Sequence, residues 1–251
     1  MKTNKNYPLV YGHRGASGYC PENTMISFEK ARDLGADGVE LDVQMSKDGV
    51  LVVIHDESVD RTSNGHGFVK DHTFEQLRKL NFNRTHPEYP WADIPTLEEV
   101  LKMIKEAGMI VNIELKNGIF DYPGLEQKVI GLVRKLEMEE QVIYSSFNHK
   151  SCLRIHDIDP KAYVGFLYED GFLNVPDYVS DHGGNALHPA FYLLQDPKTI
   201  IRARELGLEI NTWTVNDEQY MEACCQQRLT GIITNYPDRA LAIVKKYRSN
   251  Q

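Results

Sequence analysis

The sequence lacks any long hydrophobic run. No apolar stretch of its 251 residues approaches the roughly 20 residues that a helix needs to cross a membrane, so no membrane span is expected. The N-terminal stretch M-K-T-N-K-N-Y-P-L-V carries basic side chains but lacks the apolar segment of a signal peptide. We therefore expect a cytoplasmic protein without a stable association with membranes.

Cysteine is scarce, and its pattern excludes two uses. The four cysteines, Cys20, Cys152, Cys224 and Cys225, show none of the paired spacings of a zinc site. The adjacent pair lies in a helix-like segment, where a disulfide between neighbours would be strained. We expect free thiols, which agrees with a reducing cytoplasm.

Positive charge is in deficit. There are 28 Lys and Arg side chains against 36 Asp and Glu, which gives a net charge of -8 and a pI of about 5.6. This balance disfavours nucleic acid as a partner recognised by overall charge, although a small anion can still bind at a locally positive site. The length and composition fit one large soluble domain, expected to span residues 1–251.

The chain is organised around the stretch from Gly38 to Asp56, G-V-E-L-D-V-Q-M-S-K-D-G-V-L-V-V-I-H-D. Glu40 and Asp42 alternate with aliphatic residues, so a strand would place both acids on one face. The K-D-G tripeptide is typical of a tight turn, and an apolar return strand then leads to His55. Carboxylates this close need a proton or a cation between them, and a hard divalent cation is the simplest answer.

The rest of the chain alternates strands and helices. Each of eight predicted strands is followed by a helical or crossover segment, a size and rhythm typical of a (β/α)8 TIM barrel. A doubly wound sheet is disfavoured because no glycine-rich fingerprint joins the first strand to its helix. We interpret residues 57–93 as a small insertion after the second strand unit, and we expect its three histidines to be surface residues. The predicted strands begin near Leu9, Val39, Ile110, Val142, Ala162, Ala186, Glu209 and Gly231.

In a TIM barrel the chemistry lies at the C-terminal ends of the strands. Three carboxylates there would carry three negative charges, which a divalent cation, Arg14 and Lys116 would convert to one net positive charge. A phosphodiester would balance that charge, and two histidines would suit general acid–base chemistry. A structural ion-pair cluster is disfavoured because buried charge networks add little net stability. The predicted strand ends supply His13, Arg14, Glu40, Asp42, Asn112, Glu114, Lys116, Ser145, Phe147, His188, Trp213 and Asn235.

A series of short motifs, each weak alone, is specific in its order and spacing. They are H-R-G at 13–15, P-E-N-T at 21–24, V-E-L-D-V at 39–43, H-D at 55–56, R-T-S-N-G at 61–65, P-T-L-E-E at 95–99, N-I-E-L-K at 112–116, S-F at 146–147, W-T-V-N at 213–216 and G-I-I-T-N at 231–235. Through them the chain resembles the glycerophosphodiester phosphodiesterase family from end to end. The resemblance implies a barrel with a small insertion, and hydrolysis of glycerophosphodiesters to glycerol 3-phosphate and an alcohol.

The resemblance also implies roles for particular residues. It implies that Glu40, Asp42 and Glu114 hold one divalent cation, calcium or magnesium, and that His13 and His55 are the acid–base pair. We favour His55 as the acid and His13 as the base.

Further residues follow from the same resemblance. Arg14 and Lys116 are implied to bind the phosphate, and Phe147 and Trp213 to form walls of the substrate pocket. One position departs from the family pattern, because many members have an acidic residue where this chain has Asn235. We expect the asparagine to keep a helix-capping role.

Two other functions stay open as alternatives. A lysophospholipase D would need apolar surface around the mouth, for instance at Phe68, Phe82, Phe172 or Phe191, but no basic amphipathic helix for membrane binding is found. A barrel that binds a phosphodiester without cleaving it is disfavoured because both histidines are present. The head-group alcohol, the ion and the oligomeric state are open, and Tyr89 and Trp91 in the insertion suit either packing on the barrel or an interface.

Overall fold

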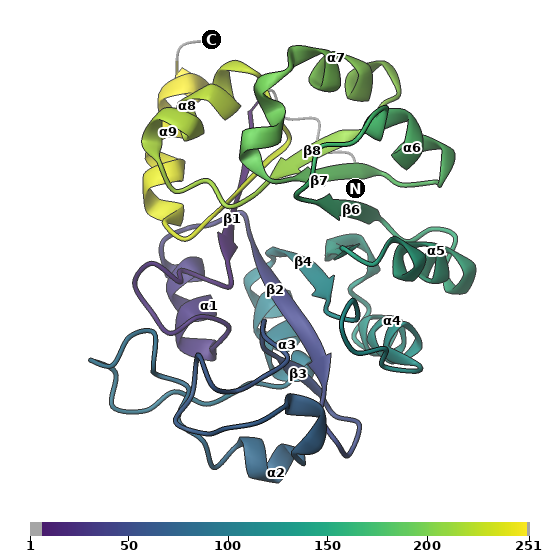
Figure 1. Cartoon of the computed structure of the whole chain (residues 1–251). Helices are drawn as coiled ribbons and strands as arrows, with labels where there is room; N and C mark the ends of the chain where they lie inside the picture. Colours follow the sequence, from purple (N-terminus) through teal and green to yellow (C-terminus); the bar gives the residue numbers. More distant parts are fainter. Residues whose placement is uncertain (1–6, 250–251) are drawn as a thin grey trace.

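The computed structural model describes residues 7–249 as a closed barrel surrounded by helices (Figure 1). Residues 1–6, the first part of the N-terminal stretch considered as a signal peptide, lie outside the described residues. No helix within residues 7–249 is long and apolar enough to cross a bilayer. The strands are β1 (Leu9–His13), β2 (Gly38–Met45), β3 (Leu51–Val53), β4 (Ile110–Leu115), β5 (Val142–Ser146), β6 (Val164–Tyr168), β7 (Ala186–Pro189), β8 (Glu209–Thr212) and β9 (Gly231–Thr234).

The predicted TIM barrel and its hairpin are confirmed. All strands except β3 run parallel, and the pairing of β1 with both β2 and β9 closes the barrel. β3 instead runs antiparallel to β2, with Val53 opposite Val43 and Leu51 opposite Met45. Since the parallel strands all end at one rim, the polar residues at their C-terminal ends are brought to a common mouth.

Helices link the strands, and local sequence sets their bounds. At α3, Thr96 and Glu99 form a reciprocal capping box, and Gly108 ends the helix at a φ of 64°. The helices are α1 (Met25–Asp33), α2 (Phe74–Leu77), α3 (Leu97–Ala107), α4 (Leu125–Lys135), α5 (His149–Ile158), α6 (Val175–Asp181), α7 (Pro197–Glu205), α8 (Glu218–Gln226) and α9 (Pro237–Ser249), with 3-10 turns η1 (Val69–Asp71), η2 (Glu139–Gln141) and η3 (Phe191–Gln195).

The apolar core lies between the barrel wall and the helices. Phe28 of α1, Leu101 of α3 and Phe166 of β6 are fully buried in it. Inside the barrel a smaller cluster forms around Leu9 and Tyr11 of β1. All four cysteines are buried free thiols, as predicted.

The insertion has its own apolar cluster and packs on the hairpin. Figure 1 shows this segment in blue beside β3, far from the helices α6 to α9. Its cluster consists of Val52, Ile54, Val59, Val69, Leu77, Phe82 and Ile94. The Tyr89 hydroxyl lies 3.2 Å from Cys20 Sγ and therefore packs on the first strand–helix loop, whereas Trp91 is exposed. The insertion histidines His66, His72 and His86 are exposed or half-buried, as expected.

Candidate active site

Three carboxylates lie together near the mouth of the barrel. Strand register places Asp42 of β2 directly beside Glu114 of β4, with Glu40 two residues earlier on the same face of β2. All three are buried, and each offers an oxygen within 4.8 Å of the others. Glu40 and Asp42 therefore share one face of β2, as the alternation in the sequence predicts.

The electrostatics of this cluster leave it short of positive charge. Burial, together with Asp42 and Glu114, raises the pKa of Glu40 well above its usual value. Burial also raises the pKa of Asp42, but Arg14 and then His55 outweigh it and hold that pKa below its usual range. Asp42 Oδ1 is buried without a hydrogen-bond partner. An orphaned carboxylate oxygen beside two further carboxylates is a donor set that fits a hard divalent cation.

His13 lies at the end of β1, and Asn235 orients it. The His13 Nδ1 is 2.7 Å from Asn235 Oδ1, which also accepts a hydrogen bond from Ser17 Oγ. An amide oxygen only accepts, so the Nδ1 carries the proton and the unprotonated Nε2 lies 3.9 Å from Glu40 Oε2. Burial and the neighbouring Arg14 lower the pKa of His13 to about 3, which keeps the imidazole neutral.

The expected helix-capping role of Asn235 is wrong. Helix α9 begins at Pro237, two residues further on, so Asn235 is not its cap. Its side-chain oxygen faces the barrel interior and binds His13 and Ser17 instead. Asn235 is thus a neutral acceptor for a histidine.

His55 lines the same pocket as His13 and is likewise held through Nδ1. Its Nδ1 is 2.6 Å from Asp56 Oδ1, and its Nε2 is 3.2 Å from the Lys116 ammonium. Lys116 also donates to Glu114 Oε1 at 2.8 Å. The hairpin thus delivers a histidine and β4 delivers a lysine to one side of the carboxylates.

Arg14 joins the carboxylates from the other side. Its backbone N–H donates to Glu40, its Nε lies 3.3 Å from Asp42 Oδ2, and its Nη1 donates to Glu22 at 2.8 Å. Asn23 donates to Asp42 Oδ2 at 2.8 Å, while Thr24 caps α1. The P-E-N-T motif therefore supplies two residues, Glu22 and Asn23, to which the sequence assigned no such role.

Two aromatic residues border the opening. Phe147 and Trp213 meet edge to face at 5.5 Å between ring centroids, and the Lys116 ammonium lies 5.8 Å from the Phe147 centroid. They line one pocket with the histidines, and the residues lining it are His13, Arg14, Glu40, His55, Asn112, Glu114, Phe147, Leu167, Trp213 and Ile233.

His188, counted above among the strand-end residues, does not line this pocket. It is fully buried in the barrel interior, with Nε2 3.0 Å from Asn211 Nδ2. Its ring lies against Gly165, where an added Cβ would come within 2.3 Å of Nε2. Trp213 covers it by donating from Nε1 to the His188 carbonyl. The expectation that His188 contributes to the mouth is wrong.

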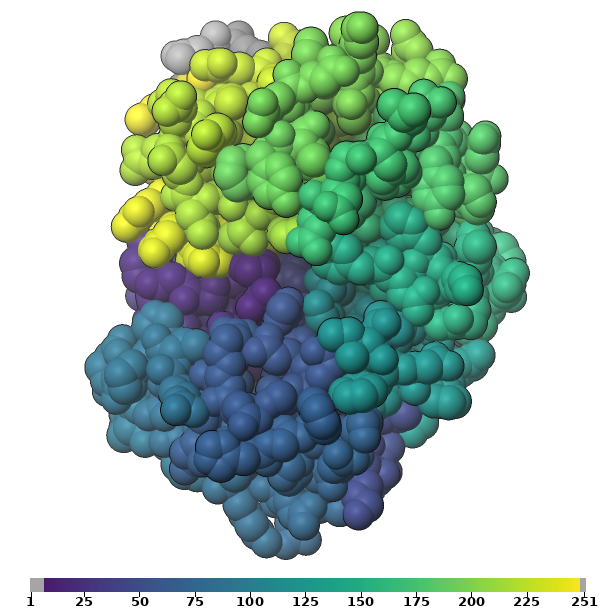
Figure 2. All heavy atoms as spheres, in the orientation of Figure 1, coloured from purple at the N-terminus to yellow at the C-terminus, as the bar shows by residue number. Residues whose placement is uncertain are grey.

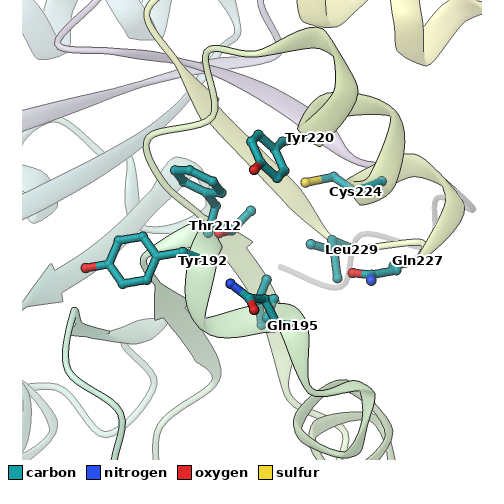
Figure 3. A pocket seen from close by; sticks show the side chains of 10 residues that line it. Tyr192, Gln195, Thr212, Tyr220, Cys224, Gln227 and Leu229 are labelled. Atoms are coloured by element: carbon teal, nitrogen blue, oxygen red, sulfur yellow. The ribbon is translucent and has the colours of Figure 1, made fainter.

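A second pocket lies on the outer wall of the barrel, between η3 and α8 (Figure 3). Tyr192, Tyr220 and Cys224 border it, and neither a carboxylate nor a histidine does. It lacks the groups that acid–base chemistry needs, so the polar pocket at the mouth is the candidate active site.

The fold and this charge arrangement define the class: a barrel enzyme with acid–base groups and cations set for a small anionic substrate. The sequence model of the glycerophosphoryl diester phosphodiesterase family matches residues 13–239. A glycerophosphodiester phosphodiesterase from Caldanaerobacter subterraneus is 43% identical over 239 residues, 95% of this chain and 98% of that one. One from Bacillus altitudinis is 40% identical over 238 residues, 93% and 97% of the two chains. The chain therefore belongs to the glycerophosphoryl diester phosphodiesterase family.

Solved structures agree with this assignment. An Oleispira antarctica phosphodiesterase in complex with the product sn-glycerol-3-phosphate superposes with a TM-score of 0.84 at 28% identity, over 95% of this chain and 97% of that one. A glycerophosphoryl diester phosphodiesterase structure from Silicibacter pomeroyi has a TM-score of 0.87 at 25% identity, over 96% and 94% of the two chains.

Proposed function

We propose that the protein hydrolyses glycerophosphodiesters to glycerol 3-phosphate and an alcohol, with the help of one divalent cation. The observation that carries this proposal is the convergence of three buried carboxylates with two histidines whose Nδ1 atoms are already occupied. The product named in the Oleispira antarctica complex supports the substrate class.

Glu40, Asp42 and Glu114 are the ligands that we propose for the cation, either calcium or magnesium. Buried carboxylate oxygens without enough protein cations suit both ions. When bound, such an ion polarises the phosphoryl oxygens and offsets the charge that develops on them during the reaction.

The chain's own residues then divide the remaining work. His13 Nε2 takes the proton of the attacking water, whose oxygen forms the new bond to phosphorus. Where a substrate hydroxyl attacks instead, the cyclic phosphodiester that it forms is opened by water in a second step. The bond from phosphorus to the alcohol oxygen breaks, and His55 gives that oxygen a proton. Arg14 and Lys116 bind the phosphate. Phe147 and Trp213 confine the substrate from the side.

The test is release of glycerol 3-phosphate from glycerophosphocholine after treatment with a chelator, and again after addition of calcium or magnesium. We expect no release without metal and restored release with one of the two ions. The variant Glu40→Gln should lose metal-dependent release while it keeps the thermal unfolding profile of the fold. Full activity of that variant would contradict the proposal.

Lysophospholipid is a second candidate substrate, favoured by an exposed aromatic side chain at the end of a barrel strand. Phe172 is exposed and meets Tyr168, which ends β6, whereas Phe191 lines the outer pocket and not the one at the mouth. Phe82 does not contribute as expected, because it is buried inside the insertion. Equal amounts of lysophosphatidylcholine and glycerophosphocholine, assayed side by side, separate the two substrates. Release from neither, with tight binding of the substrate, would instead favour a barrel that only binds.

We also propose that the reaction takes place in the cytoplasm on a small free substrate. The buried free thiols agree with a reducing compartment.

A further inference from the structure

One arginine of the insertion binds two carboxylates that belong to the barrel loops. Arg61 donates from Nε and Nη2 to the two oxygens of Asp56, at 2.6 and 3.0 Å. It donates from Nη1 and Nη2 to the two oxygens of Glu22, at 2.7 and 2.8 Å. The guanidinium thus makes two bidentate contacts at once, an arrangement that lysine cannot reproduce.

Each of these carboxylates holds a residue of the active site. Asp56 is the partner of His55 Nδ1 at 2.6 Å, and Glu22 accepts from Arg14 Nη1 at 2.8 Å. Burial raises the pKa of Glu22, but Arg61 and Arg14 lower it more, so its carboxylate is charged at neutral pH. Figure 2 shows the blue insertion beside the purple N-terminal segment on this face of the molecule.

We propose that Arg61 is a positioning residue that fixes His55 and Arg14 together, so that the insertion is part of the catalytic apparatus. This role rests on the function proposed above for those two residues. Without Arg61, Asp56 and Glu22 would face each other as like charges and rotate apart. His55 would then lose its orientation towards the leaving oxygen, and Arg14 would be drawn away from the phosphate.

A purely structural role would make Arg61 only an anchor of the insertion. The insertion has other anchors, because its apolar cluster joins Val52 and Ile54 of the hairpin to Leu77 of α2. Arg78 also ties it to the barrel by pairing with Glu99 of α3, and it pairs with Asp93 at the end of the insertion. The Arg61 side chain is 44% exposed, and ion pairs of exposed side chains add little stability, so we expect the fold to survive its replacement.

Arg78 is therefore the matched control. Both arginines bridge two carboxylates, and their side chains are 44% and 30% exposed. The full-length variants Arg61→Met, Arg61→Lys and Arg78→Met are compared in the presence of metal. One substrate is glycerophosphocholine, and the other is the 4-nitrophenyl diester of glycerol 3-phosphate, whose leaving group departs without a proton.

With glycerophosphocholine, we expect Arg61→Met to lower kcat by about 100-fold, because a general acid contributes about 100- to 10,000-fold. With the nitrophenyl ester the fall in kcat should be under about 10-fold, while KM rises for both substrates through Arg14. Arg61→Lys should lie between Arg61→Met and wild type. Arg78→Met should keep both constants within about two-fold of wild type. If Arg61→Met lowers kcat equally on both substrates, or if Arg78→Met lowers kcat as much, Arg61 is only an anchor of the insertion.

A second measurement does not need turnover. In ¹⁵N-histidine NMR spectra, the His55 Nδ1–H bonded to Asp56 should give a slowly exchanging signal in wild type and Arg78→Met. Loss of that signal in Arg61→Met supports the positioning role, and its persistence overturns it. The wild-type protein could show the His55 Nδ1–H signal and yet release no glycerol 3-phosphate with any metal. That result would refute the proposed function and leave the role of Arg61 in orienting His55 intact.

Discussion

Replacement of Asn235 tests how His13 is oriented. The variant Asn235→Leu removes the acceptor of the His13 Nδ1–H at 2.7 Å and leaves a buried donor without a partner. Such a donor costs about 1–3 kcal/mol, and each 1.4 kcal/mol corresponds to a factor of ten in population. The ring would turn or change tautomer to escape that cost. We therefore expect kcat to fall by about 10- to 100-fold, with little change in KM.

Steady-state kinetics on glycerophosphocholine with saturating metal measure this effect. Ser17→Ala is the control, because it removes a hydroxyl that lies 2.7 Å from the His13 backbone carbonyl and 3.0 Å from Asn235 Oδ1, and leaves the bond between the Asn235 and His13 side chains in place. We expect it to lower kcat by less than about three-fold, the effect of one weak neutral hydrogen bond. An Asn235→Leu enzyme with the kcat of wild type would refute the orientation of His13 by this residue.

Other perturbations test the cation and the pocket wall. In metal-free protein the pKa of Glu40 is raised above 4.5. The folded state therefore keeps a proton that the unfolded chain releases. The stability of the metal-free protein falls as the pH rises from about 4.5 through the raised pKa of Glu40. A cation displaces that proton, so the rise in Tm on adding calcium or magnesium should be larger at about pH 8 than at about pH 5, by scanning calorimetry. The variant Trp213→Ala removes the ring that meets Phe147 edge to face, and should raise KM by about two- to ten-fold, whereas Trp213→Phe should restore most of it. An unchanged KM in Trp213→Ala would remove this residue from the substrate wall.

Much of the fold was predictable because its determinants are local. Alternation placed Glu40 and Asp42 on one face, and the T-L-E-E sequence that opens α3 set its start through a capping box. The prediction for His188 failed because its burial depends on residues that are distant in the sequence. The strand pattern places His188 at a strand end but does not give the depth of its ring, which lies against Gly165 of β6 and binds Asn211 of β8.

The partners of the active-site residues were missed for the same reason. Asn235 is 222 residues from His13, and Arg61 is 39 residues from Glu22. Both lie in motifs that carry the family resemblance. A motif marks a residue without saying which distant side chain it contacts, and only the closed barrel brings these pairs together.

The two histidines differ in the acceptor that holds each of them, and this difference bears on their roles. Both use Nδ1 for that bond, which leaves Nε2 of His13 beside Glu40 and Nε2 of His55 beside Lys116. His13 has a neutral amide as its acceptor, and burial and the nearby Arg14 outweigh this bond and lower the pKa of the ring, which is therefore neutral and can take a proton. His55 has the carboxylate of Asp56 as its acceptor, 2.6 Å from Nδ1, and a carboxylate is a stronger hydrogen-bond acceptor than an amide. On this difference we base the proposal that His13 is the base and His55 the acid, an assignment that the histidines alone did not decide.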